Sequence, residues 1–208
     1  MTTFLDIIGS VVIGGIFITI LLNLNDSAVE NAYVYGNELT LQENLVSIAT
    51  LLEYDFRKMG QCADPNNQPD VPILAASDTA ITFVGDLPDA LNPFGDGVPD
   101  TIAYYLGPAG EMSANPRIRI LYRTVNNGAP VGSNMGVTQF RLQYFDGTGT
   151  VLPPPVASPA QIYTVQIDLK VENVYGVRTF TGNGAPDSTT DASSAIWREM
   201  RFTAHEGH

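Results

Sequence analysis

Side chains with oxygen ligands are concentrated in one stretch of the sequence, GDLPDALNPFGDGVPD, at residues 85–100. Carboxylate and amide oxygens are the ligands that Ca²⁺ prefers, and a glycine after an aspartate permits the sharp turn of calcium loops. Counted from Asn92, such residues fall at positions one, five and nine, but position three is Phe94 and position twelve is Ala103. The stretch therefore departs from an EF-hand loop. It predicts either a calcium-binding loop or a hairpin loop with solvated acids, and its candidate ligands are Asp86, Asp89, Asn92, Asp96 and Asp100.

Other patterns that support chemistry are missing from the sequence. It contains no P-loop, dinucleotide-binding glycine pattern, HExxH, CxxC or nucleophile elbow, and no pattern marks a pair of catalytic carboxylates. Cys62 is the single cysteine, and both histidines lie within the last four residues. With 22 acidic against 10 basic residues, the net charge of -12 repels phosphate backbones. These features predict a protein that is not an enzyme and does not bind nucleic acid.

The N-terminal part of the chain is apolar. No charged residue occurs from Ile7 to Asn25, and this stretch is long enough to cross a bilayer as a helix. Within it, the run IIGSVVIGGIFITILL is apolar on every face. One alternative is a buried core helix, although a helix that is apolar all round fits poorly on so small a domain. Another is a cleaved signal peptide, but no basic residue precedes Arg57 and no small-x-small site follows the run.

Beyond the apolar run, the spacing becomes that of an amphipathic helix. Apolar residues recur at steps of three and four, whereas Glu43, Glu53, Asp55, Arg57 and Lys58 are expected to face elsewhere. Gly60 is a candidate C-cap. A continuous helix over 3–59 would be about 85 Å long at 1.5 Å per residue. The predicted apolar stripe consists of Leu41, Leu45, Ile48, Leu52, Phe56 and Met59.

After residue 60 the sequence predicts a linker and then short strands with period-two alternation, separated by turn signals such as Asp96-Gly97 and Asp146-Gly147. Short connections favour antiparallel pairing. The predicted fold class is therefore α+β, a long helix packed on a mainly antiparallel sheet. Its expected parts are an apolar helix at 1–25, an amphipathic continuation at 26–59 and a β-rich domain at 60–208. The expected strands are 81–84, 101–106, 117–124, 137–145, 162–172 and 196–204.

On these features the chain resembles the superfamily of type IV pilins and type II secretion pseudopilins. The start MTTFLDIIGSVVIGG is similar to that family's N-terminus, which has a glutamate at the fifth mature position. If Met1 is removed, Asp6 becomes the fifth residue. The chain has Asp where the family has Glu, and it shows no basic leader ending in glycine, so leader processing and N-terminal methylation stay open.

The resemblance implies that the apolar helix is stored in the inner membrane and then buried in the core of a polymer. A carboxylate beside an apolar core is costly unless it is paired, and the α-amino group of a neighbouring subunit is an available partner for Asp6. The alternative is an acid favoured by the helix dipole or by lipid headgroups. Two small-xxx-small pairs, Ser10 with Gly14 and Gly15 with Thr19, would allow close contact with neighbouring helices.

Two functions therefore follow from the sequence. The first is a structural subunit that polymerises with itself into an extracellular filament, a pilus or pseudopilus, with the help of assembly machinery. The second is a monomeric surface-binding protein tethered to the membrane, in which the acidic loop binds Ca²⁺. Filaments would support the first and detergent-solubilised monomers the second.

Overall fold

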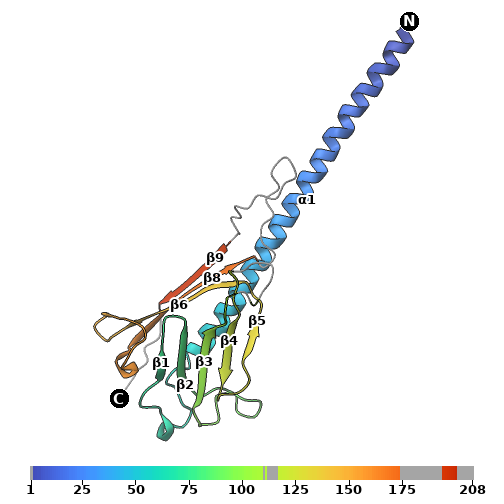
Figure 1. Ribbon diagram of the computed structural model, residues 1–208. Helices are drawn as coiled ribbons and strands as arrows, with labels where there is room; N and C mark the ends of the chain where they lie inside the picture. Colours follow the sequence, from blue (N-terminus) through green and yellow to red (C-terminus); the bar gives the residue numbers. More distant parts are fainter. Residues whose placement is uncertain (1, 110, 112–116, 174–193, 201–208) are drawn as a thin grey trace. The chain divides into compact units, whose positions relative to one another are not determined.

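The computed structural model of the chain describes residues 2–109, 111, 117–173 and 194–200. It contains one long helix, α1 (Thr2–Phe56), which is continuous through the predicted boundary at residue 25 (Figure 1). The chain divides into two compact units, and the boundary lies between Thr40 and Leu41. We call the first the N-terminal unit and the second, Leu41–His208, the β domain. The predicted division of the helix at residue 25, between an apolar and an amphipathic part, stays a prediction.

The last turns of α1 belong to the core of the β domain. Five residues of the predicted stripe are buried, and Leu45 packs against them. The helix ends at Phe56, three residues earlier than expected, and residues 57–60 form turns. Gly60 has a φ of +73°, the left-handed conformation that favours glycine after a helix. Its N–H donates to the carbonyl of Val84, 2.7 Å away, which ties the helix end to a strand.

The first sheet has five antiparallel strands in the order β1-β2-β3-β4-β5 (Figure 1). It places Ile81 and Phe83 of β2, and Ile102 and Tyr104 of β3, in the core. The Phe56 ring lies 4.9 Å from that of Phe83, between centroids. The strands are β1 (Ile73–Ala76), β2 (Ala80–Gly85), β3 (Asp100–Leu106), β4 (Leu121–Val125) and β5 (Val131–Ser133).

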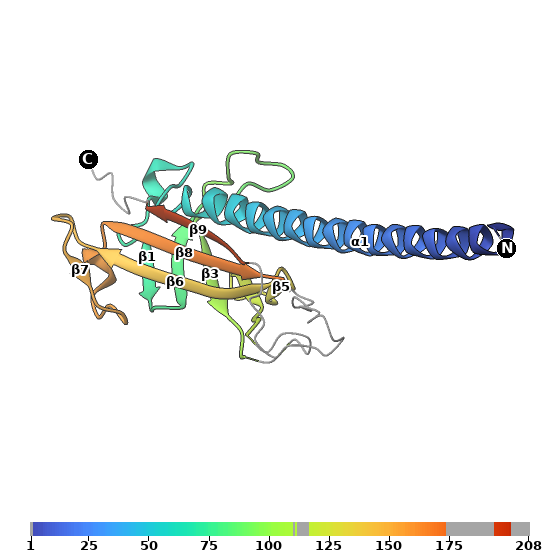
Figure 2. The ribbon, with the colours of Figure 1, turned by 90° about the horizontal axis from the view of Figure 1, so that it is seen from above.

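The second sheet has four antiparallel strands in the order β7-β6-β8-β9. Figure 2 shows β6, β8 and β9 running side by side. Along β6 the burial alternates as predicted, because Phe140, Leu142 and Tyr144 are buried while Arg141 is exposed. The strands are β6 (Val137–Phe145), β7 (Val151–Leu152), β8 (Thr164–Glu172) and β9 (Ser194–Met200).

One hydrophobic cluster joins the end of α1 to strands of both sheets. The α+β class and the antiparallel pairing are therefore confirmed. The division into two sheets was not predicted, because periodicity shows which residues of a strand are buried but not which strands pair. Two short 3₁₀ helices, η1 (Pro65–Asn67) and η2 (Pro159–Gln161), lie in the connections.

The strand predictions were wrong in two respects. Strands β1, β5 and β7 were missed, since two to four residues are too few to display an alternating pattern. The strand expected at 117–124 begins only at Leu121. The preceding segment connects the sheets instead: the Ile120 carbonyl accepts from the N–H of Gly107, and the Arg119 N–H donates to the Val137 carbonyl, both at 2.8 Å. Residues 201–204 of the last predicted strand lie outside the described residues.

Candidate functional site

The predicted assembly residues all lie on α1 in the N-terminal unit, where none of the described side chains of residues 3–40 is buried. The helix holds an 18-residue window that is long and apolar enough to cross a membrane. Among the described side chains of the first 24 residues, thirteen large apolar ones are exposed: Phe4, Ile7, Ile8, Val11, Val12, Ile13, Ile16, Phe17, Ile18, Ile20, Leu21, Leu22 and Leu24.

The small residues of this segment present little polarity outward. The Ser10 hydroxyl donates to the Asp6 carbonyl at 2.8 Å, and the Thr19 hydroxyl donates to the Gly15 carbonyl at 2.9 Å. Both hydroxyls are therefore engaged with the backbone of their own helix. A Cβ atom at Gly14 or Gly15 would meet no atom within 4 Å. A side chain added there would not disturb the helix, so any steric effect must arise from a neighbouring molecule.

Asp6 is the fifth residue of α1, and the first turn contains no acidic residue. The favourable interaction of a carboxylate with the helix dipole falls off within that first turn. The dipole therefore gives little support to the alternative explanation for Asp6. Its side chain is exposed, which leaves it accessible to a partner.

The acidic loop, residues 86–99, connects β2 with β3, and its first residue is buried. The Asp86 carboxylate accepts hydrogen bonds from the N–H groups of Ala63 (2.9 Å), Asp96 (3.1 Å) and Gly97 (3.0 Å). A Cβ atom at Gly95 would collide with this carboxylate, and Gly95 has a φ of +108°, so both space and conformation require glycine. Asp86 thus fixes the shape of the loop.

The other candidate calcium ligands also bond to nearby backbone groups. Asp89 accepts from the N–H groups of Leu91 (2.6 Å) and Asn92 (2.7 Å), and hydrogen bonds from these two, that of Asn92 foremost, lower the pKa of Asp89. Asp96 accepts from the N–H of Val98 at 2.9 Å. Asp100 accepts from the N–H of Leu87 at 3.0 Å and from the Asn126 amide at 2.6 Å. The bonds of Asp89 and Asp96 are those of turns, whereas the bonds of Asp100 tie the start of β3 to residues 13 and 26 positions away.

Across residues 2–109, 111, 117–173 and 194–200, no three His, Cys, Asp or Glu side chains gather closely enough to hold a metal ion. The acidic loop therefore brings together Asp86, Asp96 and Gly97 through hydrogen bonds, and it does not arrange the carboxylates of Asp89 and Asp100 around one centre. Calcium binding stays a prediction.

If the loop binds Ca²⁺, the melting temperature of the protein will be higher with Ca²⁺ than with a chelator, because a ligand at one hundred times its Kd stabilises the folded state by about 2.7 kcal/mol. Asp96→Ala will remove that difference. Asp146→Ala, in a separate turn that has the same kind of aspartate–backbone bonds, will leave it intact. Equal melting temperatures of the parent protein in the two conditions would contradict calcium binding.

The most buried charge of the β domain was placed wrongly by the sequence analysis. Asp55 was expected to face away from the apolar stripe, yet its side chain is fully buried. Its carboxylate accepts from Arg123 Nε and from the Tyr104 hydroxyl, each at 2.5 Å. Burial, and then the charge of Asp55, raises the pKa of Tyr104 above its ordinary value. Asp55 lies three residues after Leu52 and four before Met59, and this helical spacing was the signal that could have revealed its position.

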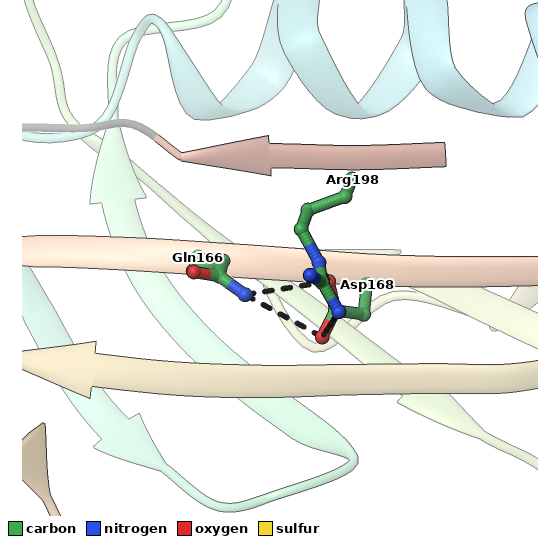
Figure 3. Close-up of polar contacts among 3 residues, drawn as sticks. All are labelled: Gln166, Asp168 and Arg198. Carbon is green, nitrogen blue, oxygen red and sulfur yellow. Dashed lines mark hydrogen bonds and ion pairs between the residues drawn. The ribbon is translucent and has the colours of Figure 1, made fainter. Parts of the chain in front are cut away.

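A row of polar side chains on β8 was also missed. Figure 3 shows the Asp168 carboxylate between Gln166 and Arg198, a residue of the neighbouring strand β9. Arg198 donates to both carboxylate oxygens, and the Gln166 amide lies 3.3 Å from the nearer one. Further along the same strand, the buried Glu172 forms ion pairs with Arg117 and Lys170, both at 3.0 Å. Because Asp168 and Glu172 are paired with basic side chains, the polar face of β8 can be buried as well as its apolar face.

No protein-family model and no curated protein matches the chain. Among solved structures, it is similar to the type IV-like pilin TTHA1219 from Thermus thermophilus. The two share 14% sequence identity, the match covers 77% of this chain and 96% of that one, and the TM-score is 0.44.

Proposed function

We propose that this chain is a pilin-like structural subunit that polymerises through its N-terminal helix into an extracellular filament, a pilus or pseudopilus. Before assembly the helix is held in the inner membrane, and assembly machinery transfers the subunit to the cell surface. The proposal rests on the thirteen large apolar side chains that α1 exposes within its first 24 residues. Enzymatic activity and nucleic-acid binding form no part of it.

The energetic argument compares the helix with the rest of the chain. Removing a large apolar side chain from water contributes about 1.5–3 kcal/mol, so thirteen of them strongly favour lipid or other helices over water. Asp6 accounts for one unit of the net charge of -12, and the remaining residues account for eleven. Repulsion between these surface charges is screened beyond about 8–10 Å at physiological salt. Helix burial therefore outweighs charge repulsion in a polymer.

The two small-xxx-small pairs support packing between helices. Gly14 and Ser10 lie on one side of α1, and Gly15 and Thr19 lie on an adjoining side. Small residues let helix backbones approach closely, and two sides allow a subunit to contact a neighbour on each. The alternative function, a membrane tether for a monomeric binding protein, needs only one span and makes no use of two such sides.

Electron microscopy of the full chain tests the proposal. The parent protein will form filaments, and 1 M NaCl will stabilise them, because salt screens the repulsion without weakening apolar contacts. Gly14→Gln will reduce filament yield on the order of tenfold or more, since it inserts a polar side chain where helices pack. Gly36→Gln is the matched control, because Gly36 also has open space around it but lies outside the apolar run. Monomers in detergent with no filaments would favour the tether.

A second prediction concerns Asp6. If its carboxylate pairs with the amino group of a neighbouring subunit, Asp6→Ala will abolish or strongly slow assembly, because that amino group loses its partner in the core. Asp6→Glu keeps the charge and will retain assembly. Circular dichroism of the monomer will be unchanged in both variants. Normal filament yield from Asp6→Ala would show that the carboxylate has no role between subunits.

A further inference from the structure

The acidic loop exposes large apolar side chains on a well-defined backbone. Leu91 is 88% exposed and Phe94 is 85% exposed. The N–H of Leu91 bonds to the Asp89 side chain, and the N–H of Gly95 donates to the Asn92 carbonyl at 3.1 Å. A segment held by its own hydrogen bonds loses little conformational entropy on binding. The exposed pair is therefore suited to contact a partner.

The charge around this apolar pair indicates the chemistry of the partner. Asp89 and Asp96 flank Leu91 and Phe94, and both acids are exposed. Within residues 86–99 no basic residue occurs. Anionic lipid surfaces repel such a loop, whereas a basic surface on a protein attracts it.

A basic pocket of about 460 Å³ exists in the same domain. Its lining includes Arg117, Arg119 and Lys170, three of only ten basic residues in the chain, and one acid, Glu172. Glu172 is buried and holds Arg117 and Lys170 at 3.0 Å each, which fixes these two cations at the pocket wall. The lining therefore has an excess of positive charge in a chain that is otherwise strongly acidic.

The loop and the pocket lie at opposite ends of strand β3. The acidic loop leads directly into Asp100, the first residue of β3, and the strand ends at Leu106, three residues before Ala109 of the pocket lining. Figure 1 shows β3 as a central strand of its sheet. A contact between two such different surfaces would be heterologous, and a heterologous contact repeats from copy to copy into an open filament where its rotation does not close into a ring.

We propose that the acidic loop of one copy docks into the basic pocket of the next copy. Asp89 and Asp96 then lie near Arg119 and Lys170, while Leu91 and Phe94 cover the aliphatic stems of the basic side chains. The proposal rests on the proposed function in one respect, that the chain self-associates. It adds a contact between β domains to the contact between helices.

Photocrosslinking of the full chain tests the docking. A benzophenone amino acid replaces Phe94, and ¹⁵N-labelled and unlabelled chains are mixed before assembly and irradiation. We expect mixed-isotope crosslinks from position 94 to peptides that contain Arg119, Thr138 or Lys170. The same probe at Val151, an exposed residue of β7, is the control and will not reach these peptides.

Charge reversal provides the second measurement. Arg119→Glu will lower the crosslink yield on the order of tenfold, and Asp89→Lys with Asp96→Lys on the partner copy will restore it, because like charges across an interface are repulsive. Arg141→Glu, an exposed residue of β6 outside the pocket lining, will have little effect. Thermal melts of each variant identify any that fail to fold. In that event Leu91→Ser, on the exposed loop, replaces it and will lower the crosslink yield from position 94, because it removes an apolar side chain from the contact.

Filaments without these crosslinks, or with crosslinks to another part of the domain, would overturn the docking and leave the proposed function standing. Crosslinks that Arg119→Glu leaves at full yield, while the variant folds, would also overturn it. A chain that stays monomeric would overturn both proposals. Crosslinks to a different protein in cell extracts, in place of a second copy, would assign the loop to that partner and contradict docking between copies.

Discussion

Removal of residues 2–25 will convert the chain into a soluble monomer that no longer forms filaments. The deletion takes away the thirteen large apolar side chains that are described as exposed in this segment, and it leaves in place the hydrophobic cluster of the β domain, which begins at Leu41. Burial of those side chains contributes about 1.5–3 kcal/mol each in lipid or in a polymer. No other stretch of similar length among the described residues exposes as many large apolar side chains. The expected effect is therefore complete loss of assembly.

Analytical ultracentrifugation and electron microscopy measure this outcome, and circular dichroism checks that the truncated domain is folded. A longer deletion, of residues 2–59, is the control. It also removes Leu41, Ile48, Leu52, Phe56 and Met59 from the hydrophobic cluster, so the remaining domain will be unfolded or aggregated. Soluble filaments formed by the shorter deletion would show that the β domain, and not the helix, drives assembly.

The elements that could be predicted from the sequence are those with long, regular patterns. The apolar stripe of α1 has six members at helical spacing, and β6 alternates over nine residues, so their burial follows directly from the chain. Strand β1 has only four residues and β7 only two. Such strands are defined by the neighbours with which they pair, and pairing between distant segments leaves no local signal.

The buried charges show a different limit. Asp55 lies at the spacing of the buried stripe, and only its charge favours an exposed position, whereas Asp168 also occupies an alternating polar position of β8. Each is paired with an arginine from a neighbouring element. Arg123 is 68 residues from Asp55 along the chain, so no local pattern links the two.

The acidic loop shows a related limit. Its five candidate ligands were grouped by their ligand chemistry, whereas in the structure the Asp86 carboxylate accepts hydrogen bonds from backbone N–H groups of the loop. A carboxylate serves equally well as a metal ligand or as an acceptor for turns, and sequence alone does not separate the two.

Replacement of Arg123 by alanine will be among the most destabilising single changes in the β domain. Asp55 is fully buried, and Arg123 supplies its counter-charge through two hydrogen bonds at 2.5 and 3.2 Å. Without Arg123, only the Tyr104 hydroxyl remains among these partners. Leaving a buried charge without its counter-charge costs about 3–5 kcal/mol.

For a chain of this size, each kcal/mol shifts the melting temperature by about 2–4 °C, so the expected fall for Arg123→Ala is on the order of 10 °C. Arg57→Ala is the matched control. It also removes an arginine from an ion pair, but Arg57 is exposed and pairs with Glu53 on the surface, where such a pair contributes about 0.3–0.5 kcal/mol. The double change Asp55→Leu with Arg123→Met will recover much of the loss, because apolar residues of similar volume often replace a buried ion pair without penalty. Equal melting temperatures for Arg123→Ala and Arg57→Ala would mean that Asp55 does not depend on Arg123, and that the link between α1 and β4 is held by apolar packing alone.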